Sequence, residues 1–517
     1  MVPLRVLWLS FVHSVFAFTV AIPCSPADNA PVISPSLVSL SIEQDRWPEW
    51  AGTASRNRYF LNTLENLRDI TGAPPYIRIG ANSEDKTNFN PNVEYAEDIF
   101  PLPTVIVPYP EATNITVGAT YYHLAHHLPE GTHVIWGVNL GQNNLTAAVL
   151  EAQAIIGAFN SSSCKVQLDF IEIGNEADLY ANNGDRAKNY SSSQYVQEWT
   201  TFATNISETV KLNEIETKFL LGAFAGSSYK PTGFSPQAIY AEGVLNSTAG
   251  SLVTAFSEHH YSGSFCAGQG GLLQDLMTKS TIRGNLTIYA GDVNATHAQN
   301  LDYILGETNS FACHGAPGVS NTAGAALWAL DYLLFATQIG ISQVFFHNGI
   351  GFKYNLIQPV TLHRSILDGS PMSPLAPHVQ PAYYAAIIAA ELRGDEDTVQ
   401  ITEIAVNNTR IAGYAAFEDG ELARALFINS EAFLRGDTNR SSIHLDLDFS
   451  DDSDAPSSMT IKRLNIGYAD DVSDLTWGNQ TYGTDDGKVD GTLAVGSAPV
   501  VDGVDISATE VVLLEFC

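Results

Sequence analysis

Two glutamates stand at the carboxyl ends of two short apolar segments. Residues 169–176 read Asp-Phe-Ile-Glu-Ile-Gly-Asn-Glu and end on Glu176, and residues 302–309 read Asp-Tyr-Ile-Leu-Gly-Glu-Thr-Asn, with Glu307 near their end. Short apolar runs like these are typical of buried parallel strands, and barrel enzymes carry their catalytic groups at the carboxyl ends of such strands. Two carboxylates facing one substrate can break a glycosidic bond. The pair therefore indicates glycoside hydrolysis.

Glu176 is predicted to be the general acid and base of this pair. A general acid needs a raised pKa and a position beside the oxygen of the leaving group. The preceding Asn175 could hydrogen-bond the 2-hydroxyl of the sugar, a contact that strengthens in the transition state. Taken alone, Gly-Asn-Glu is more often a turn that begins a helix. The apolar run before it and the second glutamate favour the catalytic interpretation.

Glu307 is predicted to be the nucleophile, which must stay ionised and lie about 5–5.5 Å from its partner if configuration is retained. The alternative is a structural carboxylate paired with an arginine, and Arg78, at the end of an earlier strand-like run, is the candidate partner. A neighbouring cation would also lower the pKa of a nucleophile. Both interpretations predict the same contact, so the contact does not discriminate between them.

Further polar groups follow other strand-like runs. Glu43 comes directly after the first run and could accept hydrogen bonds from sugar hydroxyls. Tyr261 could hydrogen-bond the nucleophile, although a structural, half-buried tyrosine is the alternative. The loop at 348–354 offers backbone amides, the Lys353 ammonium and the Tyr354 phenol, which suit an anionic group, while its glycines also fit a simple turn.

No metal or organic cofactor is expected. His259 and His260 are adjacent, so they would point to opposite faces of a strand and make a poor metal site. The five cysteines show no metal-binding spacing. Cys266 and Cys313 each lie a few residues beyond a predicted strand, on neighbouring loops, and are the expected disulfide. The pairing of the remaining cysteines stays open: Cys24, Cys164 and Cys517.

Strand-like and helix-like segments alternate from residue 37 to residue 395. Eight strand-like runs, each followed by a helical or loop segment, predict a (β/α)₈ TIM barrel in the α/β class. The long segment between the second and third runs is rich in Pro and Asn and indicates an elaborated active-site loop. The eight runs are 37–42, 76–81, 133–140, 170–174, 219–224, 253–260, 303–307 and 343–347, with helix-like spacing at 58–70, 147–159, 195–210 and 323–339.

Residues 396–517 have a different pattern, with short strands separated by Asp, Gly and Ser turns. This predicts a C-terminal antiparallel β-sandwich domain. The N-terminal segment 22–36 could add a strand to it, since chain termini often lie close together. The strand-like runs are 399–406, 410–417, 423–429, 442–447, 459–465 and 508–516.

The first 21 residues predict a signal peptide and therefore secretion. Arg5 precedes an apolar run from Val6 to Ala21, in which Ala17 and Ala21 are small residues suited to cleavage. No later segment has about 18 uninterrupted apolar residues, so no membrane span is expected. Many glycosylation sequons support secretion. They begin at Asn114, Asn144, Asn160, Asn189, Asn205, Asn246, Asn285, Asn294, Asn407, Asn439 and Asn479.

The charge balance excludes several classes of partner. The net charge is −31, from 25 Lys+Arg against 56 Asp+Glu, while 45% hydrophobic residues are ample for a core. A surface this acidic repels nucleic acid, anionic membranes and polysulfated polymers, which bind to basic patches. Solubility in an acidic medium also accounts for an acidic surplus.

These motifs resemble the glycoside hydrolases of the 4/7 superfamily, whose acid/base and nucleophile follow the fourth and seventh barrel strands. Within it the chain looks most like family 79, the group of β-glucuronidases and heparanase, over nearly its whole length. The resemblance implies that Glu176 is the acid/base and Glu307 the nucleophile, that Glu43, Asn175 and Tyr261 contact the sugar, and that Tyr354 lies near the uronate carboxylate. The matching motifs are Arg78-Ile79-Gly80-Ala81-Asn82-Ser83, Ile173-Gly174-Asn175-Glu176, Gly306-Glu307-Thr308-Asn309-Ser310 and Gln343-Val344-Phe345-Phe346.

The chain departs from the family pattern just after the predicted nucleophile. Family members commonly carry a Tyr-Gly pair five and six residues after it, where this chain has Ala312 and Cys313, followed by His314. Uronate recognition is therefore expected to involve other groups, such as His314, Lys353 or loop amides, or the substrate preference differs.

We expect a secreted, retaining exo-β-glycosidase, foremost a β-glucuronidase that releases terminal glucuronic acid or its 4-O-methyl form. A heparanase-like endo enzyme would need a basic groove, which the acidic charge disfavours. Two alternatives remain at this stage. One is a retaining β-glycosidase for a neutral sugar, and the other is a non-catalytic carbohydrate-binding or cell-wall protein on the same scaffold.

Overall fold

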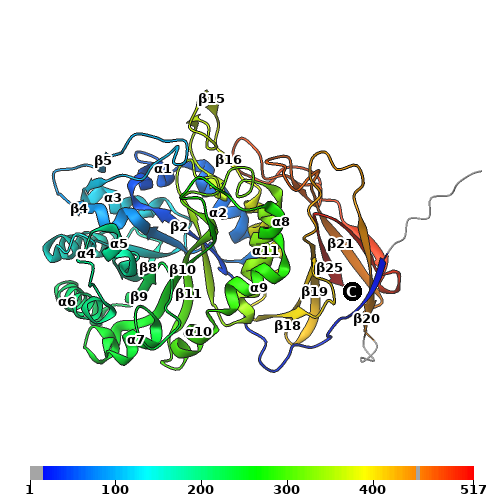
Figure 1. Cartoon of the computed structure of the whole chain (residues 1–517), viewed down its shortest axis with the longest axis horizontal. Helices are drawn as coiled ribbons and strands as arrows, with labels where there is room; N and C mark the ends of the chain where they lie inside the picture. Colours follow the sequence, from blue (N-terminus) through cyan, green and yellow to red (C-terminus); the bar gives the residue numbers. More distant parts are fainter. Residues whose placement is uncertain (1–15, 450–454) are drawn as a thin grey trace, which may run out of the picture.

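The computed structural model describes residues 16–449 and 455–517 and shows a barrel on one side and a β-domain on the other (Figure 1). Eight parallel strands close the barrel, and each overlaps one of the eight predicted runs, so the predicted (β/α)₈ fold is confirmed. In chain order the strands are β2 (Val38–Glu43), β3 (Ile77–Gly80), β7 (His133–Val138), β8 (Gln167–Ile173), β9 (Lys218–Phe224), β10 (Val253–Ser264), β11 (Asp302–Ala312) and β12 (Gln343–Asn348).

Helices cover the outside of the barrel, so its strands are buried on both faces and read as nearly continuous apolar runs. Helix α11 is buried almost all round, because α12 and α9 pack on it and β17 of the β-domain contacts it as well. The longer helices are α2 (Arg58–Thr71), α4 (Leu145–Phe159), α6 (Ser192–Val210), α9 (Lys279–Thr287), α10 (Ala290–His297), α11 (Ala323–Gln338) and α12 (Ala382–Arg393). Short helices are α1 (Trp47–Ala51), α3 (Ala119–His123), α5 (Tyr180–Asn183), α7 (Pro236–Ala241) and α8 (Leu273–Met277).

Two insertions build up the carboxyl-terminal face of the barrel. The first follows β3 and forms a small sheet of β4 (Thr87–Phe89), β6 (Asn114–Val117) and β5 (Ala96–Ile99). We call the loop that joins β5 to β6, residues 100–113, the strap. The second insertion follows β12 and contains the pairs β13 (Ile357–Gln358) with β16 (His378–Val379) and β14 (Leu362–Arg364) with β15 (Pro371–Leu375). Strand β15 projects from the barrel in Figure 1.

The β-domain consists of two sheets with apolar side chains between them, and the predicted β-sandwich is confirmed. The larger sheet has the order β17–β18–β19–β25–β21–β22, with β23 paired to β21. Its strands are β17 (Val399–Ile404), β18 (Ile411–Glu418), β19 (Glu421–Asn429), β21 (Ser458–Asn465), β22 (Thr476–Trp477), β23 (Gly496–Pro499) and β25 (Glu510–Phe516). The smaller sheet is β1 (Phe16–Ala21), β20 (Ser442–Asp448) and β24 (Val504–Ser507), in the order β1–β20–β24.

The N-terminal strand differs from the expectation. Strand β1 pairs in parallel with β20 and overlaps the end of the predicted signal peptide, whereas 22–36 contributes an isolated bridge from Val32 to Gln400. Val20 is buried in the β-domain core, which explains why these apolar residues join the sheet. Cleavage after Ala17 would leave most of β1 in place, and cleavage after Ala21 would remove it. The rest of the predicted signal peptide, 1–15, lies outside the described residues.

Among the residues that the structure describes, no helix is long and apolar enough to cross a membrane.

Candidate active site

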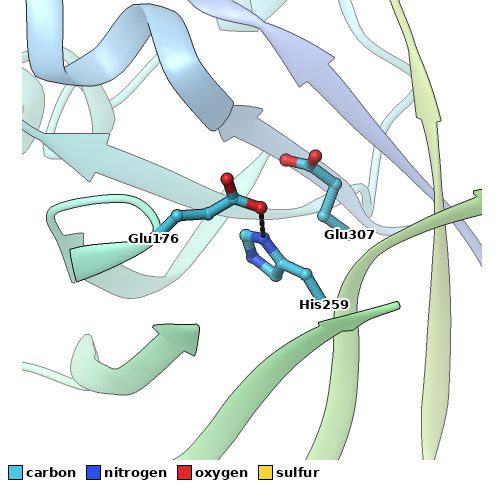
Figure 2. A group of neighbouring side chains, drawn as sticks. All are labelled: Glu176, His259 and Glu307. Carbon is cyan, nitrogen blue, oxygen red and sulfur yellow. Dashed lines mark hydrogen bonds and ion pairs between the residues drawn. The ribbon is translucent and has the colours of Figure 1, made fainter. Parts of the chain in front are cut away.

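The two predicted catalytic glutamates face one another across the carboxyl-terminal mouth of the barrel, with His259 between them (Figure 2). Glu176 follows β8, Glu307 lies on β11 and His259 lies on β10. One carboxylate oxygen of each glutamate and one ring nitrogen of His259 all lie within 4.8 Å of one another. Carboxylates this close are nearer to the spacing for retention, about 5–5.5 Å, than to the spacing for inversion, about 6.5–9.5 Å.

A sharp turn after β8 aims Glu176 at the site. Gly174 has φ +79°, and a Cβ there would come within 2.5 Å of the Leu140 side chain, so glycine is required. Glu176 itself adopts the left-handed conformation, with φ 51° and ψ 47°. Its amide donates to the carbonyl of Ala223 on β9 at 2.7 Å. The turn thus holds a glutamate in a backbone conformation that non-glycine residues seldom adopt.

The environment of Glu176 suits a general acid. Burial, followed by the negative charge of Glu307, raises the pKa of Glu176 to about 8. His259 Nδ1 lies 3.0 Å from Glu176 Oε1. Burial lowers the pKa of His259 to about 4, so its imidazole is neutral near neutral pH. A neutral imidazole can accept from the protonated carboxyl or donate to the carboxylate, so it can serve both forms of Glu176.

Glu307 is held in place by hydrogen bonds to both of its oxygens. Arg78 Nη1 donates to Oε2 at 2.9 Å, and Tyr261 donates its hydroxyl to Oε1 at 2.7 Å. Arg78 is fully buried, and its other donors bind Ser41, Glu172 and Asn175 at 2.8–2.9 Å. The predicted contact between Arg78 and Glu307 is present. Because one guanidinium fixes side chains from three strands and the Asn175 turn, it orders the floor of the site.

The charges around Glu307 keep it ionised. Burial opposes ionisation, but the charges of His347 and Arg78 and the hydrogen bond from Tyr261 together hold the pKa of Glu307 well below its ordinary value. We assign no part of this effect to His259 near neutral pH, because that ring is then uncharged. The two carboxyls therefore have opposite pKa shifts, which is the division needed between a proton donor and a nucleophile.

Glu43 belongs to a second buried polar group beside Glu307. Its Oε1 lies 3.2 Å from His347 Nε2, and its Oε2 accepts from the amide of Ser83 at 3.0 Å. The other ring nitrogen of His347 lies 3.1 Å from Ser41 Oγ and 3.9 Å from Glu307 Oε2. Burial disfavours the imidazolium, but the charge of Glu307 and the bond to Glu43 raise the pKa of His347. These contacts thus favour the protonated, positively charged form of His347 beside Glu307.

The structure gives protein partners to two of the candidate substrate-binding residues. Lys353 is fully buried, and its ammonium donates to the carbonyl of Ile106 at 3.2 Å and lies 5.3 Å from the ring centre of Phe265. Burial lowers the pKa of Lys353 to about 8. His314 Nε2 lies 2.8 Å from Glu111 Oε1. Ile106 and Glu111 both belong to the strap, so Lys353 and His314 join the strap to the loops after β12 and β11.

Tyr354 and Asn175 lie closer to the reacting centre. The ring of Tyr354 is 6.0 Å from the ring of Tyr261 and 6.0 Å from that of His347. Asn175 is almost fully buried, and its side chain is fixed by Arg78 and by Asn82, whose Oδ1 accepts at 3.3 Å. Both residues therefore adjoin the two glutamates, as expected from their positions in the chain.

A disulfide joins the loops that follow β10 and β11. It links Cys266 to Cys313, the pair expected from the sequence, across a separation of 47 residues. Cys313 and His314 both have positive φ, 61° and 68°. The disulfide therefore anchors an unusual turn directly beside His314, where the family pattern has a different sequence.

Several residues of the site were not singled out from the sequence. Ser41, Glu172 and His347 each interrupt or end an apolar strand, between Leu40 and Ile42, between Ile171 and Ile173, and after Phe346. These three side chains point to the inside of the barrel, and an isolated polar residue in an apolar run is the signal that could have found them. Glu111 lies in the strap and carries no such signal.

The group of Glu176, His259 and Glu307 also has the donor types of a cation site. The buried guanidinium of Arg78, 2.9 Å from Glu307 Oε2, would repel a cation bound to that carboxylate. The arrangement suits proton transfer and nucleophilic attack at a sugar better than metal binding.

Comparison with known proteins agrees with this chemistry. Residues 413–513 match the family model described as the glycosyl hydrolase family 79 C-terminal beta domain. The chain is 29% identical over 494 residues to a beta-glucuronidase of Aspergillus niger, covering 90% of this chain and 86% of that protein. It is 27% identical over 527 residues to a beta-glucuronidase of Neurospora crassa, covering 92% and 90%.

Solved structures share the fold. A 4-O-α-L-rhamnosyl-β-D-glucuronidase from Fusarium oxysporum 12S has a TM-score of 0.77 at 24% identity, covering 97% of this chain and 100% of that chain. A family 51 α-L-arabinofuranosidase from Bifidobacterium longum has a TM-score of 0.57 at 14% identity, covering 96% and 99%.

A closed (β/α)₈ barrel with two close carboxyls of opposite pKa shift at its mouth, together with these relatives, identifies the chain as a glycoside hydrolase. The family match of the β-domain and the two relatives, which cover most of the chain, point to one family within this class. Together these matches support the assignment of the chain to glycoside hydrolase family 79.

Proposed function

We propose that this protein is a retaining β-glucuronidase that removes terminal glucuronic acid, or its 4-O-methyl form, from glycans. The observation that carries the mechanism is the pair of close carboxyls with opposite pKa shifts, Glu176 raised and Glu307 lowered. The sugar specificity rests on the relatives, whose names give glucuronide cleavage as their activity.

In the first step, Glu307 attacks the anomeric carbon while protonated Glu176 gives its proton to the glycosidic oxygen. The bond between carbon and aglycone oxygen breaks, the aglycone leaves as an alcohol, and an ester joins the sugar to Glu307. In the second step, the Glu176 carboxylate takes a proton from water, whose oxygen attacks the same carbon and breaks the ester. Two inversions at one carbon give net retention.

The surrounding side chains support both steps. Arg78 and Tyr261 orient the nucleophile by their hydrogen bonds. When the ester breaks and Glu307 becomes a carboxylate again, the positive charge of Arg78 and the hydroxyl of Tyr261 stabilise its negative charge. Asn175 is fixed where it can bind the 2-hydroxyl, and Glu43 can accept from other sugar hydroxyls. All of these side chains are already in place, so none of these roles requires the barrel to move.

Recognition of the uronate carboxylate falls to the side of the site where the phenol of Tyr354 lies. Lys353 lies on the same loop as Tyr354, after β12, and His314 lies on the neighbouring loop after β11. The two loops are joined by a hydrogen bond from the Lys353 amide to the His314 carbonyl at 2.8 Å. A cation held in a poorly solvated position attracts a carboxylate more strongly than one in water does. This cluster is therefore the element that would favour a uronic acid over a neutral sugar.

A panel of aryl β-glycosides tests the proposed specificity. We expect hydrolysis of the glucuronide at acidic to neutral pH, with kcat/KM at least about 100-fold above that of the glucoside and xyloside, because a site with polar groups placed for a carboxylate leaves them unpaired with a neutral sugar. Preferred cleavage of the glucoside or xyloside would establish the neutral-sugar alternative. Binding of a glycoside with no hydrolysis of any would establish the non-catalytic one.

We also propose that the protein is secreted and glycosylated. Of the sequon asparagines, Asn285 is half-buried and its amide nitrogen is inaccessible, whereas the others are exposed in the folded chain. A glycan on Asn285 would have no space in this fold. Peptide mapping of protein from a eukaryotic host should therefore find glycans on several exposed sequons, including Asn479, and none on Asn285. A glycosylated Asn285 in active protein would contradict this prediction.

A further inference from the structure

The strap, residues 100–113, runs across one side of the active-site mouth and is fixed at several points. The Ala112 amide donates to Asp45 Oδ2 at 2.7 Å, just after β2. Glu111 pairs with His314, just after β11, at 2.8 Å. The carbonyl of Ile106 accepts from Lys353, just after β12, at 3.2 Å.

A second group of contacts ties the strap to the insertion that follows β12. The Tyr109 hydroxyl donates to the Arg364 carbonyl at 2.9 Å and accepts from the Arg364 amide at 3.1 Å. Arg364 Nη1 donates to the carbonyl of Pro108 at 3.3 Å. The Tyr109 ring lies against Gly351, where a Cβ would come within 2.1 Å of Tyr109 Cδ2.

The composition of the strap makes it a stiff element. Prolines stand at 101, 103, 108 and 110, and each fixes φ near −65° and reduces the conformational freedom of the unfolded chain. At its base, β5 and β6 form an antiparallel pair, in which Ala96 lies opposite Val117 and Ile99 lies opposite Asn114. A stiff loop with paired ends and several anchors acts as a wall.

The position of this wall relative to the glutamates decides what it encloses. The general acid must lie beside the leaving oxygen, so the aglycone leaves on the side of Glu176, at the fourth barrel strand. The strap is anchored to the loops after the first, seventh and eighth strands, which lie across the barrel from the fourth. It therefore stands on the side of the glycone, beyond the sugar that Glu307 attacks.

We propose that the strap closes the glycone end of the site, so that the enzyme accepts a glucuronic acid residue whose O4 carries no sugar and rejects one that carries a further sugar there. The inference rests on the glucuronidase activity proposed above and adds the substrate class. In a glucuronide, O4 lies across the ring from the anomeric carbon, so a sugar on O4 extends away from Glu176 and toward the strap. The pairs Glu111–His314 and Lys353–Ile106 hold the wall in place.

Two aryl β-glucuronides test this proposal, one unsubstituted and one with an α-rhamnosyl group on O4. We expect the wild-type kcat/KM to be at least about 100-fold higher for the unsubstituted compound, because a rigid wall rejects the added ring by steric exclusion. Glu111→Ala and Arg364→Met each loosen one anchor and should reduce that preference by about tenfold or more, chiefly by raising activity on the substituted compound.

The control is Asp505→Asn, which removes the partner of His444 in the β-domain, where Nδ1 and Oδ1 lie 2.8 Å apart. It should leave the preference unchanged. Equal cleavage of both compounds by the wild type, or an unchanged preference in the folded strap variants, would overturn the proposal. If the wild type cleaves no glucuronide at all, the proposed function fails instead. The wild-type comparison stands by itself should either strap variant fail to fold.

Discussion

Replacing Glu307 with glycine is expected to lower kcat for an aryl β-glucuronide by at least about four orders of magnitude, because the ester to the enzyme can no longer form. The change also creates a space beside Arg78 and Tyr261, which both bind this carboxylate. A small anion such as azide should enter that space and attack the anomeric carbon once. The product would be the α-glycosyl azide, inverted relative to the substrate, and NMR spectroscopy would identify it.

Glu391→Gln is the matched control for this variant. Glu391 pairs with Lys462 at 2.8 Å, at the contact between α12 and the β-domain, and has no contact with the site. It should retain wild-type kcat. If Glu307→Gly hydrolyses the substrate at more than about one per cent of the wild-type rate, or if azide yields the β-glycosyl azide, Glu307 is not the nucleophile.

Replacing Glu176 with alanine should give a loss of activity that depends on the leaving group. A good leaving group such as 4-nitrophenolate departs without protonation, so the first step survives and the second slows for lack of a base. A glycan aglycone needs the proton, so its release should fall by about 10²–10⁴-fold, the usual contribution of acid–base catalysis. Steady-state and burst kinetics with the two kinds of substrate measure this difference. An equal loss on both would contradict the assignment.

The pH profile gives a second test of Glu176. Its pKa of about 8 belongs to the group that must be protonated in the first step, so the wild-type rate should fall as the pH rises through that value. Glu307 has a lowered pKa and must be ionised, so activity should persist well into acid. In Glu176→Ala, hydrolysis of the 4-nitrophenyl substrate should lose the decline on the basic side. A decline that persists unchanged would mean that another group controls it.

The barrel could be predicted from the sequence because its strands are buried on both faces. Each of them reads as a short apolar run at a regular distance from the next, so even the order of Glu176 and Glu307 around the barrel followed from counting. The longer strands of the β-domain were predictable for a related reason, since they are short strand-like runs separated by Asp, Gly and Ser turns. The three strands β22, β23 and β24 were missed because they are too short to show a periodic sequence pattern.

Contacts between distant loops could not be predicted. Lys353 and His314 were identified as polar groups near the site, but nothing in the sequence indicates that Ile106 and Glu111 in the strap would engage them. The pairing of the N-terminal strand β1 could not be predicted either, because its apolar residues fit a signal peptide as well as a sheet. In each case the local residues allow several partners, and only the folded chain selects one.

The backbone of Glu176 has a consequence for the evolution of this fold. A left-handed conformation at a residue other than glycine, φ 51° here, costs folding free energy, roughly 1–2 kcal/mol. Removing a carboxyl from water adds to that cost. Selection for stability alone would therefore replace this residue, and selection for turnover retains it. A relative that loses the reaction is free to lose the glutamate first, and its fold should gain robustness when it does.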